Sequence, residues 1–284
     1  MGGAEARVVE ALSVNAAPEL PVGVFDSGVG GLTVLHELLV ALPSENYLYL
    51  GDDARFPYGA KSGEELRECV ERDCRFLIER GVKLIVIACN SAAGAGLDTA
   101  HEIARESGVE LLAVIEPEAE IAAAITDSGR VGVLATPATV EGGAYLRALG
   151  RQRRELTVTQ VAAPDLAAII QRGFAFSQDV VDRVRSYCQP LIRARCDTVI
   201  LGCTHYPLVR PLLQRILGRD VRLVSAGHAI AATMERTLAS RDLATAQRGE
   251  GSYDFVCTGD PEAFGEIGTR FLQLPLGDVE LVEV

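Results

Sequence analysis

The sequence predicts an α/β protein of two similar domains, each with a mainly parallel sheet flanked by helices. Three observations predict this class. Short apolar runs alternate with amphipathic stretches from end to end, which is typical of parallel strands joined by helical crossovers. The 284 residues, 48% of them hydrophobic and 23% charged, are enough for one large or two medium domains. The two halves of the chain also repeat one order of features.

The strands are expected where apolar, β-branched residues cluster. Between them lie amphipathic helical patterns. The first helix should end before Pro43, which cannot continue a helix, and the second should be followed by Gly81 in a left-handed conformation. The expected strands are Val22 to Asp26, Tyr47 to Leu50, Lys83 to Ala88, Glu110 to Ile115, Val131 to Ala135, Thr157 to Val161, Thr198 to Gly202, Val221 to Val224 and Tyr253 to Cys257.

An internal repeat relates the two halves. The first half contains a strand, a loop of small residues at Asp26 to Gly31, and a later strand that leads into Cys89. The second half contains a strand, a loop of small residues at Ala135 to Thr139, and a later strand that leads into Cys203. We therefore expect two α/β units that face one another, with a boundary near Ile115 to Glu118.

Composition and charge exclude several classes of protein. The chain has 27 Lys and Arg against 39 Asp and Glu, a net charge of −12 without clustered basic runs, so we expect no nucleic-acid partner. No segment approaches the roughly 18 apolar residues of a membrane-spanning helix, so we expect no membrane partner. The seven cysteines form no CxxC pair, and Met1 to Leu20 lacks a secretory signal. These features predict reduced thiols, a cytoplasmic protein and a short extension at residues 1–20.

Small or reactive side chains follow four of the expected strands. Ligands in parallel sheets bind beyond the carboxyl ends of the strands, so these positions are the candidates for function. The four segments are Asp26-Ser27-Gly28, Cys89-Asn90-Ser91, Ala135-Thr136 and Cys203-Thr204-His205.

Cys89 and Cys203 are candidates for acid/base chemistry. A single free cysteine is usually an inert core residue, but these two occupy matching places in the repeat. A thiol of ordinary pKa is only about 3% ionised at pH 7, so a catalytic cysteine needs its pKa lowered by a helix N-terminus or a cationic neighbour. A helical pattern follows both cysteines, and His205 lies two residues after Cys203. Zinc would find no third and fourth ligand nearby, so we expect no metal.

Two loops suggest the kind of ligand. The Gly-rich loop Asp26 to Gly31 offers backbone N–H groups at a helix start, which can hold an anion. The carboxylate of Asp26 would repel a phosphate, yet it would attract an ammonium group. A ligand that carries both an ammonium group and a carboxylate is an amino acid, so an amino acid is the expected ligand. The turn-forming loop Gly51 to Gly59 is either an ordinary surface loop or part of the same site.

Five motifs resemble those of the cofactor-independent glutamate racemases, and the similarity runs from about Val22 to the C-terminus. The wider aspartate/glutamate racemase superfamily shares the paired cysteines, whereas DSGVGG with the Pro-Tyr-Gly loop is similar to the glutamate branch. The motifs are VGVFDSGVGGLTVL, GDDARFPYG, IVIACNSA, VIEP and VILGCTHYPLV.

The resemblance implies two α/β domains with the active site in the cleft between them. We expect residues 21–114 plus 226–284 to form the first domain and residues 115–225 the second. The implied reaction interconverts L- and D-glutamate by two-base proton transfer without a cofactor and supplies D-glutamate for peptidoglycan. Dimers are usual for the family, so a homodimer is expected.

The resemblance also implies roles for individual residues. Cys89 would serve the D-enantiomer and Cys203 the L-enantiomer, with Asp26 and His205 as their respective neighbours in proton transfer. The implied substrate-binding residues are Asp26, Ser27, Pro57, Tyr58, Gly59, Asn90, Ser91, Thr136, Thr139, Thr204 and His205.

The chain departs from the family pattern at two places that concern the site. Ser91 replaces a more common Thr and keeps the hydroxyl, and Gln171 stands where the family carries a Glu near the second cysteine. Two other functions stay open. One is racemisation of aspartate or another amino acid, because one methylene changes binding by only about 1–3 kcal/mol. The other is a non-catalytic regulator that keeps the fold.

Overall fold

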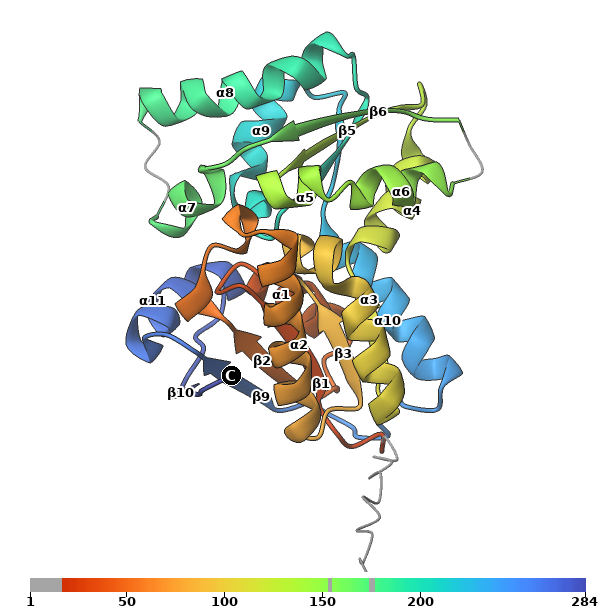
Figure 1. Cartoon of the computed structure of the whole chain (residues 1–284), viewed down its shortest axis with the longest axis vertical. Helices are drawn as coiled ribbons and strands as arrows, with labels where there is room; N and C mark the ends of the chain where they lie inside the picture. Colours follow the sequence, from red (N-terminus) through yellow and green to blue (C-terminus); the bar gives the residue numbers. More distant parts are fainter. Residues whose placement is uncertain (1–16, 153–154, 174–176) are drawn as a thin grey trace, which may run out of the picture.

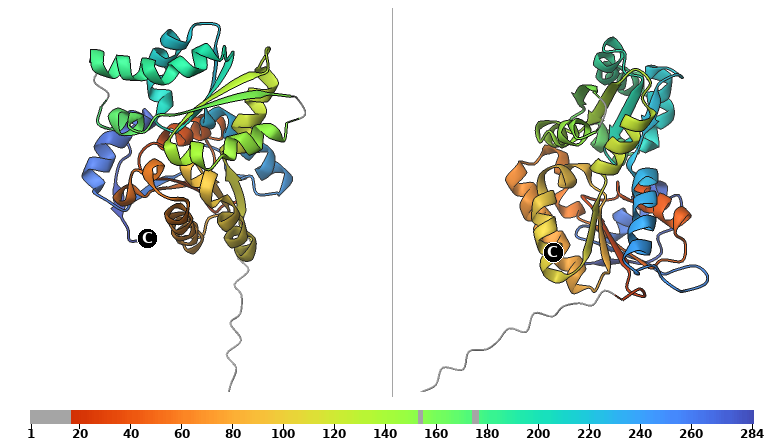
Figure 2. Two further views of the ribbon diagram at one scale, coloured as in Figure 1. Left: turned by 45° about the horizontal axis from the view of Figure 1, so that its top comes forward. Right: turned by 90° about the vertical axis from the view of Figure 1, so that its right-hand side faces the viewer.

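The structure is a computed structural model that describes residues 17–152, 155–173 and 177–284, so most of the expected extension, residues 1–16, lies outside the described residues. The chain forms two lobes stacked along the long axis of the molecule (Figure 1). Each lobe is a parallel sheet between layers of helices (Figure 2), which confirms the predicted α/β class. Within the described ranges, no helix is both long and apolar enough to span a bilayer.

The first sheet has six strands in the order β10-β9-β2-β1-β3-β4, and every pairing is parallel. Helices cover both of its faces, so β1, β2 and β3 are buried throughout and their sequences are continuous apolar runs. The strands are β1 Val22–Asp26, β2 Tyr47–Gly51, β3 Leu84–Ile87, β4 Glu110–Ala113, β9 Tyr253–Cys257 and β10 Val279–Leu281.

Five helices cover the first sheet. On one face lie α1 (Leu32–Ala41), α10 (Ala226–Ser240) and α11 (Pro261–Leu272); on the other lie α2 (Gly63–Glu79) and α3 (Asn90–Ser107). As predicted, α1 ends before Pro43, and Gly81 follows α2 with φ +76°. A capping box between Ser62 and Glu65 fixes the start of α2.

The second sheet has four parallel strands in the order β6-β5-β7-β8. Helices again pack on both faces. The strands are β5 Arg130–Ala135, β6 Thr157–Ala162, β7 Thr198–Gly202 and β8 Arg222–Val224, and the helices are α4 Ile115–Ile125, α5 Pro137–Glu141, α6 Ala144–Gly150, α7 Leu166–Gln171, α8 Gln178–Arg193 and α9 Arg210–Leu217.

The two sheets reverse their winding at corresponding strands. In the first sheet β1 lies between β2 and β3, and in the second β5 lies between β6 and β7. A crevice opens at the carboxyl ends of the strands where the winding reverses, and ligands bind there. The internal repeat therefore corresponds to two similar sheets, and it places the loops after β1, β3, β5 and β7 in two equivalent crevices.

The chain crosses between the lobes twice, once through α4 and once between β8 and α10 (Figure 1). All strands of the first sheet fall in residues 21–114 and 226–284, and all strands of the second fall in residues 115–225. We propose these ranges as the two domains.

One strand was not predicted from the sequence. β10 (Val279–Leu281) pairs only with β9 at the edge of the first sheet, and its residues are half-buried or exposed. A short edge strand needs no apolar run, so its sequence lacks the signal that marks the buried strands.

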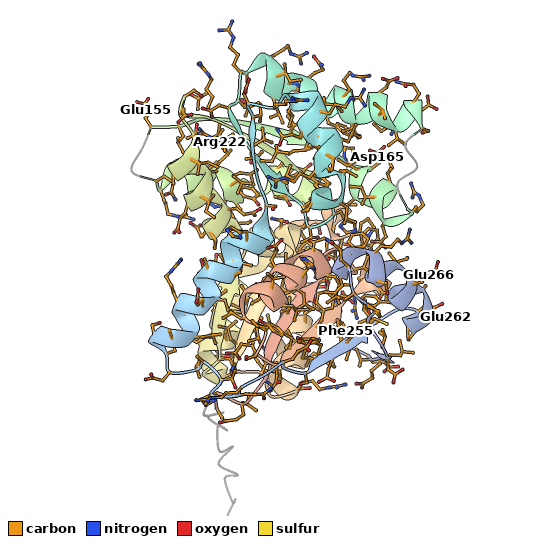
Figure 3. All side chains as sticks on the ribbon, turned by 180° about the vertical axis from the view of Figure 1, so that it is seen from behind. Glu155, Asp165, Arg222, Phe255, Glu262 and Glu266 are labelled. Atoms are coloured by element: carbon orange, nitrogen blue, oxygen red, sulfur yellow. The ribbon has the colours of Figure 1, made fainter. Side chains whose placement is uncertain are left out.

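Most charged side chains lie outside the core, as Glu262 and Glu266 do where they point away from α11 (Figure 3). Lys83 and Glu45 form a buried ion pair. Lys83 Nζ lies 2.5 Å from Glu45 Oε2, and both side chains are buried. Lys83 also donates to the Pro18 carbonyl, and Glu45 accepts the backbone N–H of Thr245. The pair thus joins four segments of the first lobe.

We expect Lys83→Met to lower the free energy of unfolding by about 3–5 kcal/mol, because it leaves the carboxylate of Glu45 buried without its cation. Urea denaturation measures the loss. The control is Arg75→Ala, which breaks an exposed pair with Glu71 and should cost less than about 0.5 kcal/mol. Equal losses in the two variants would contradict a structural role for the buried pair.

Candidate active site

Cys89 and Cys203 line one cavity between the lobes. Each follows a fully buried interior strand of its sheet, β3 or β7, and both thiols are buried. Cys89 is the residue that precedes α3, so its side chain lies beside the free backbone N–H groups of that helix. The structure thus brings one cysteine from each half of the repeat to the same site.

The helical pattern predicted after Cys203 begins at Tyr206 as a short 3-10 helix, Tyr206–Val209, and the α-helix α9 begins only at Arg210. Pro207 explains the difference, because an α-helix here would require its missing N–H to bond the carbonyl of Cys203. Backbone N–H groups of His205 and Tyr206 lie near the Cys203 thiol and partly offset the effect of its burial on its pKa.

Most of the predicted site residues line the cavity. Asp26 and Thr139 are the exceptions and lie directly behind it. The predicted residues that line it are Ser27, Pro57, Tyr58, Gly59, Cys89, Asn90, Ser91, Thr136, Cys203, Thr204 and His205. Sequence reasoning missed five further lining residues, which are Phe56, Ala60, Pro164, Ala167 and Ala168. Their signal was weak, since they are apolar neighbours of the Pro57 loop and of Gln171.

Asp26 lies at the end of β1 beneath the Gly-rich loop. Its Oδ2 accepts the backbone N–H of Gly31 at 3.0 Å, and its Oδ1 lies 3.4 Å from Thr204 Oγ1. Burial raises the pKa of Asp26 to about 6, while hydrogen bonds, including one from Cys89, oppose the rise. Asp26 therefore supports the first cysteine and touches the loop that carries the second.

The two lobes approach closely at Gly30. A Cβ on this residue would lie 2.4 Å from Thr204 Oγ1 and 2.5 Å from the His205 ring. Only glycine fits at this contact, which explains one glycine of the Gly-rich loop. Thr33 Oγ1 also donates to the Thr204 carbonyl at 2.8 Å, so α1 and the Cys203 loop are tied together.

Three hydroxyls join the lobes on the other side of the cavity. Ser91 Oγ lies 2.9 Å from Thr136 Oγ1 and 3.2 Å from Thr139 Oγ1, and the two threonines are 3.0 Å apart. The Ser91 hydroxyl thus makes the contacts that the more common Thr would also offer. Nearby, a Cβ on Gly59 would lie 2.6 Å from Thr136 Cβ, so this glycine allows the loop to reach the second lobe.

The Tyr58 side chain points away from the ligand position. Its hydroxyl donates to Asp52 at 2.5 Å and lies 3.0 Å from Asp73, so its hydrogen bonds are made to these two residues and not to a ligand. Burial raises the pKa of Asp73 well above its usual range. Only the backbone of Tyr58 is therefore left for a ligand. Asp53 of the same loop accepts the backbone N–H groups of Thr258 and Gly259 and so anchors the loop.

His205 is buried beside Cys203. Its Nδ1 lies 3.8 Å from Cys203 Sγ, and its Nε2 lies 2.9 Å from Gln171 Oε1. The ring packs against Phe56 and Phe271. Burial lowers the pKa of His205 to about 3, so the imidazole is neutral at pH 7.

The thiols of Cys89 and Cys203 are both protonated at pH 7 when no cation is bound in the cavity. Burial raises the pKa of Cys203 to about 12 and the pKa of Cys89 well above its usual range, and the Asp26 carboxylate adds to both shifts. The N–H group of Ala92 at the start of α3 opposes the shift at Cys89. A cation bound between the two sulfur atoms would lower both pKa values.

Glu118 is a buried acid that sequence reasoning did not single out. Burial raises its pKa to about 8, against hydrogen bonds from Tyr145 and Asn90. It follows the VIEP motif by one residue on α4, so the motif itself was the available signal.

Comparison with known proteins agrees with this geometry. Residues 32–234 match the family model described as Asp/Glu/Hydantoin racemase. The chain belongs to this family. A glutamate racemase from Stutzerimonas stutzeri (strain A1501) is 40% identical over 263 residues, which cover 93% of this chain and 96% of the relative.

Two solved structures of family members are similar over nearly the whole chain. The crystal structure of a glutamate racemase isoform from Bacillus anthracis has a TM-score of 0.89 at 33% identity. The structure of glutamate racemase from Francisella tularensis subsp. tularensis SCHU S4, in complex with D-glutamate, has a TM-score of 0.87 at 31% identity. Each match covers 94% of this chain and 98% of the other.

We expect Glu118→Gln to remove part of the pH dependence of stability. In the unfolded chain Glu118 ionises near pH 4.5, whereas in the folded protein it holds its proton up to about pH 8. Its contribution to stability is therefore lost as the pH rises through this window. Relative to Glu118→Gln, the free energy of unfolding of the unmodified protein should fall by up to about 1.4 kcal/mol per pH unit. Parallel curves from urea titrations at several pH values would contradict the raised pKa.

Proposed function

We propose that this protein interconverts L- and D-glutamate, and that the reaction is a proton transfer at the α-carbon between two cysteines. One observation carries the proposal: Cys89 and Cys203 come from opposite lobes and line the same buried cavity. A substrate between them would present one face of its α-carbon to each sulfur. The glutamate racemases to which the chain is similar support glutamate as the substrate. The product would serve peptidoglycan synthesis.

The cavity suits an amino acid with two carboxylates. Hydroxyls of Ser27, Ser91 and Thr136 and the backbone of the Tyr58-Gly59 loop line it. Among the described residues that line it there is no Lys or Arg, so neutral donors would hold the carboxylates. These donors also stabilise the transition state, because removal of the α-proton moves negative charge onto the α-carboxylate.

The proposed proton transfer uses one sulfur on each face. With L-glutamate, the Cys203 thiolate removes the α-proton, and the Cys89 thiol gives a proton to the opposite face. With D-glutamate, the two sulfurs exchange roles. The substrate ammonium supplies the positive charge that lowers the thiol pKa values raised by burial. The residues themselves supply the acid and the base, so we expect turnover without added cofactor.

His205 and Gln171 would assist Cys203. Gln171 Oε1 accepts a hydrogen bond from Nε2–H of His205, which leaves Nδ1 as an acceptor facing the sulfur. A neutral amide does not stabilise an imidazolium, whereas a carboxylate would. The low pKa of His205 fits this neutral pair.

Proton NMR in D₂O, with L- and D-glutamate in separate samples and no cofactor, tests the proposal. Both enantiomers should lose the α-proton signal, and chiral analysis should find the opposite isomer. Cys89→Ser and Cys203→Ser should each lower racemisation by at least about 10²-fold, because each removes an acid/base group. Residual exchange should persist only with L-glutamate in Cys89→Ser and only with D-glutamate in Cys203→Ser.

The matched control is Cys188→Ser, which alters a buried thiol of α8 that does not line the cavity. Its turnover should stay near that of the unmodified protein. Absence of exchange from both enantiomers of glutamate would refute the proposal, and exchange from aspartate alone would move it to another acidic substrate. Binding without exchange would favour a regulatory role.

We expect His205→Ala to reduce turnover severely in the L-to-D direction. Gln171→Glu should raise the pKa of His205 and shift the acidic limb of the L-to-D pH profile upward, because a carboxylate favours the imidazolium. Initial rates in both directions across pH measure both effects. Near-normal L-to-D rates in His205→Ala would remove His205 from the mechanism.

We further propose a homodimer in the cytoplasm, as is usual for the family. Size-exclusion chromatography with and without glutamate would test the oligomeric state, and a single monomer peak under both conditions would contradict it.

A further inference from the structure

A buried hydrogen-bond network holds the side chain of Asn90. Its Nδ2 donates to Tyr145 Oη at 2.8 Å and to Glu118 Oε2 at 3.0 Å. Tyr145 in turn donates its hydroxyl proton to Glu118 Oε2. All three side chains are at most 2% exposed. Both hydrogens of the Asn90 amide are therefore used inside the protein.

The network determines which atom of Asn90 remains for a ligand. Asn90 lines the cavity, and within the described part of the chain its Oδ1 is buried without a hydrogen-bond partner. In the orientation seen, Nδ2 faces both oxygen atoms of the network and donates to each of them. The carboxamide thus presents an acceptor, and no donor, to the cavity.

We infer that Glu118 and Tyr145 are positioning residues that make Asn90 select the α-ammonium group of the substrate. The inference rests on the proposed function. The ammonium is the only donor of glutamate when both of its carboxylates are ionised, and a carboxylate at the same place would meet a second acceptor. An unsatisfied buried acceptor is costly, so the site discriminates against ligands that lack the ammonium.

The network also joins the two lobes. Asn90 begins α3 of the first lobe, whereas Tyr145 lies on α6 of the second. The Tyr145 ring packs beside Gly202, where a Cβ would lie 3.0 Å from Cε2, and Gly202 directly precedes Cys203. The network therefore fixes the position of Asn90 Oδ1, the acceptor for the ammonium, with respect to both cysteines. Proton transfer at the adjacent α-carbon requires such a fixed position.

The test compares glutamate with glutarate, which has the same two carboxylates and no ammonium. In the unmodified protein, the inhibition constant of glutarate should exceed the KM of glutamate by about tenfold or more. Tyr145→Phe keeps the ring and removes the hydroxyl that orients Asn90. Its KM for glutamate should rise about tenfold, while the inhibition constant of glutarate stays within about twofold. Glu118→Leu should have the same effect by removing the second acceptor.

One variant serves as the control. Glu116→Gln alters a half-exposed residue of the same helix, paired with Arg151 outside the cavity, and should change neither constant. Circular dichroism checks that each variant is folded.

The outcomes separate the inference from the proposed function. Turnover of glutamate by the unmodified protein decides the function on its own. Loss of discrimination in Tyr145→Phe and Glu118→Leu supports the positioning role. An unchanged ratio of the two constants, or an equal rise of both, would overturn it, because a general defect of packing weakens both ligands alike.

Discussion

The close approach of the two lobes at Gly30 is the contact on which the cavity depends. Each sheet alone provides a crevice at the carboxyl ends of its strands, with one cysteine at its edge. Neither crevice could transfer a proton across a carbon atom by itself. Only the absence of a side chain at Gly30 lets the Thr204-His205 turn reach the first lobe and close the second crevice over the first. Asp26 and Thr33 then hold the same turn by hydrogen bonds.

Desolvation dominates the electrostatics of this closed site. It is the largest cause of the pKa shifts of Asp26, Cys89, Glu118, Cys203 and His205. In every case burial favours the neutral form, so both thiols, Glu118 and His205 are neutral at pH 7, whereas Asp26, with a pKa of about 6, keeps most of its negative charge. The charges that the chemistry needs come with the ligand. A zwitterionic amino acid brings its own cation, and the buried acceptors and hydroxyls are arranged to receive it.

The sequence predicted the buried strands correctly, because their apolar runs are visible in the chain itself. It did not predict features that are set by tertiary contacts. β1, β3 and β7 are continuous apolar runs, and each leads into a small or reactive residue, so the site could be placed at their ends. β10 lies at a sheet edge and carries no such run. The helical pattern after Cys203 begins as a 3-10 helix, because Pro207 lacks the N–H that an α-helix would need there.

The motifs likewise predicted which segments line the site, but they did not predict how each side chain is oriented. Tyr58 belongs to a loop that does line the cavity, yet its hydroxyl bonds Asp52 and Asp73, which no spacing rule reveals. Glu118 and Tyr145 lie 27 residues apart and meet only through the fold. Residues that touch a ligand can be recognised in a motif because their chemistry is constrained. Residues that orient them are defined by three-dimensional contacts.

The burial of the two sulfur atoms has a consequence for successive turnovers. After one conversion in the proposed mechanism, the sulfur that began as the base carries a proton and its counterpart has lost one. Burial keeps both thiols protonated in the empty cavity, so this thiolate regains a proton once the ammonium of the product has left. Each new cycle therefore begins with the loss of one thiol proton, and both enantiomers meet the same doubly protonated form of the free enzyme.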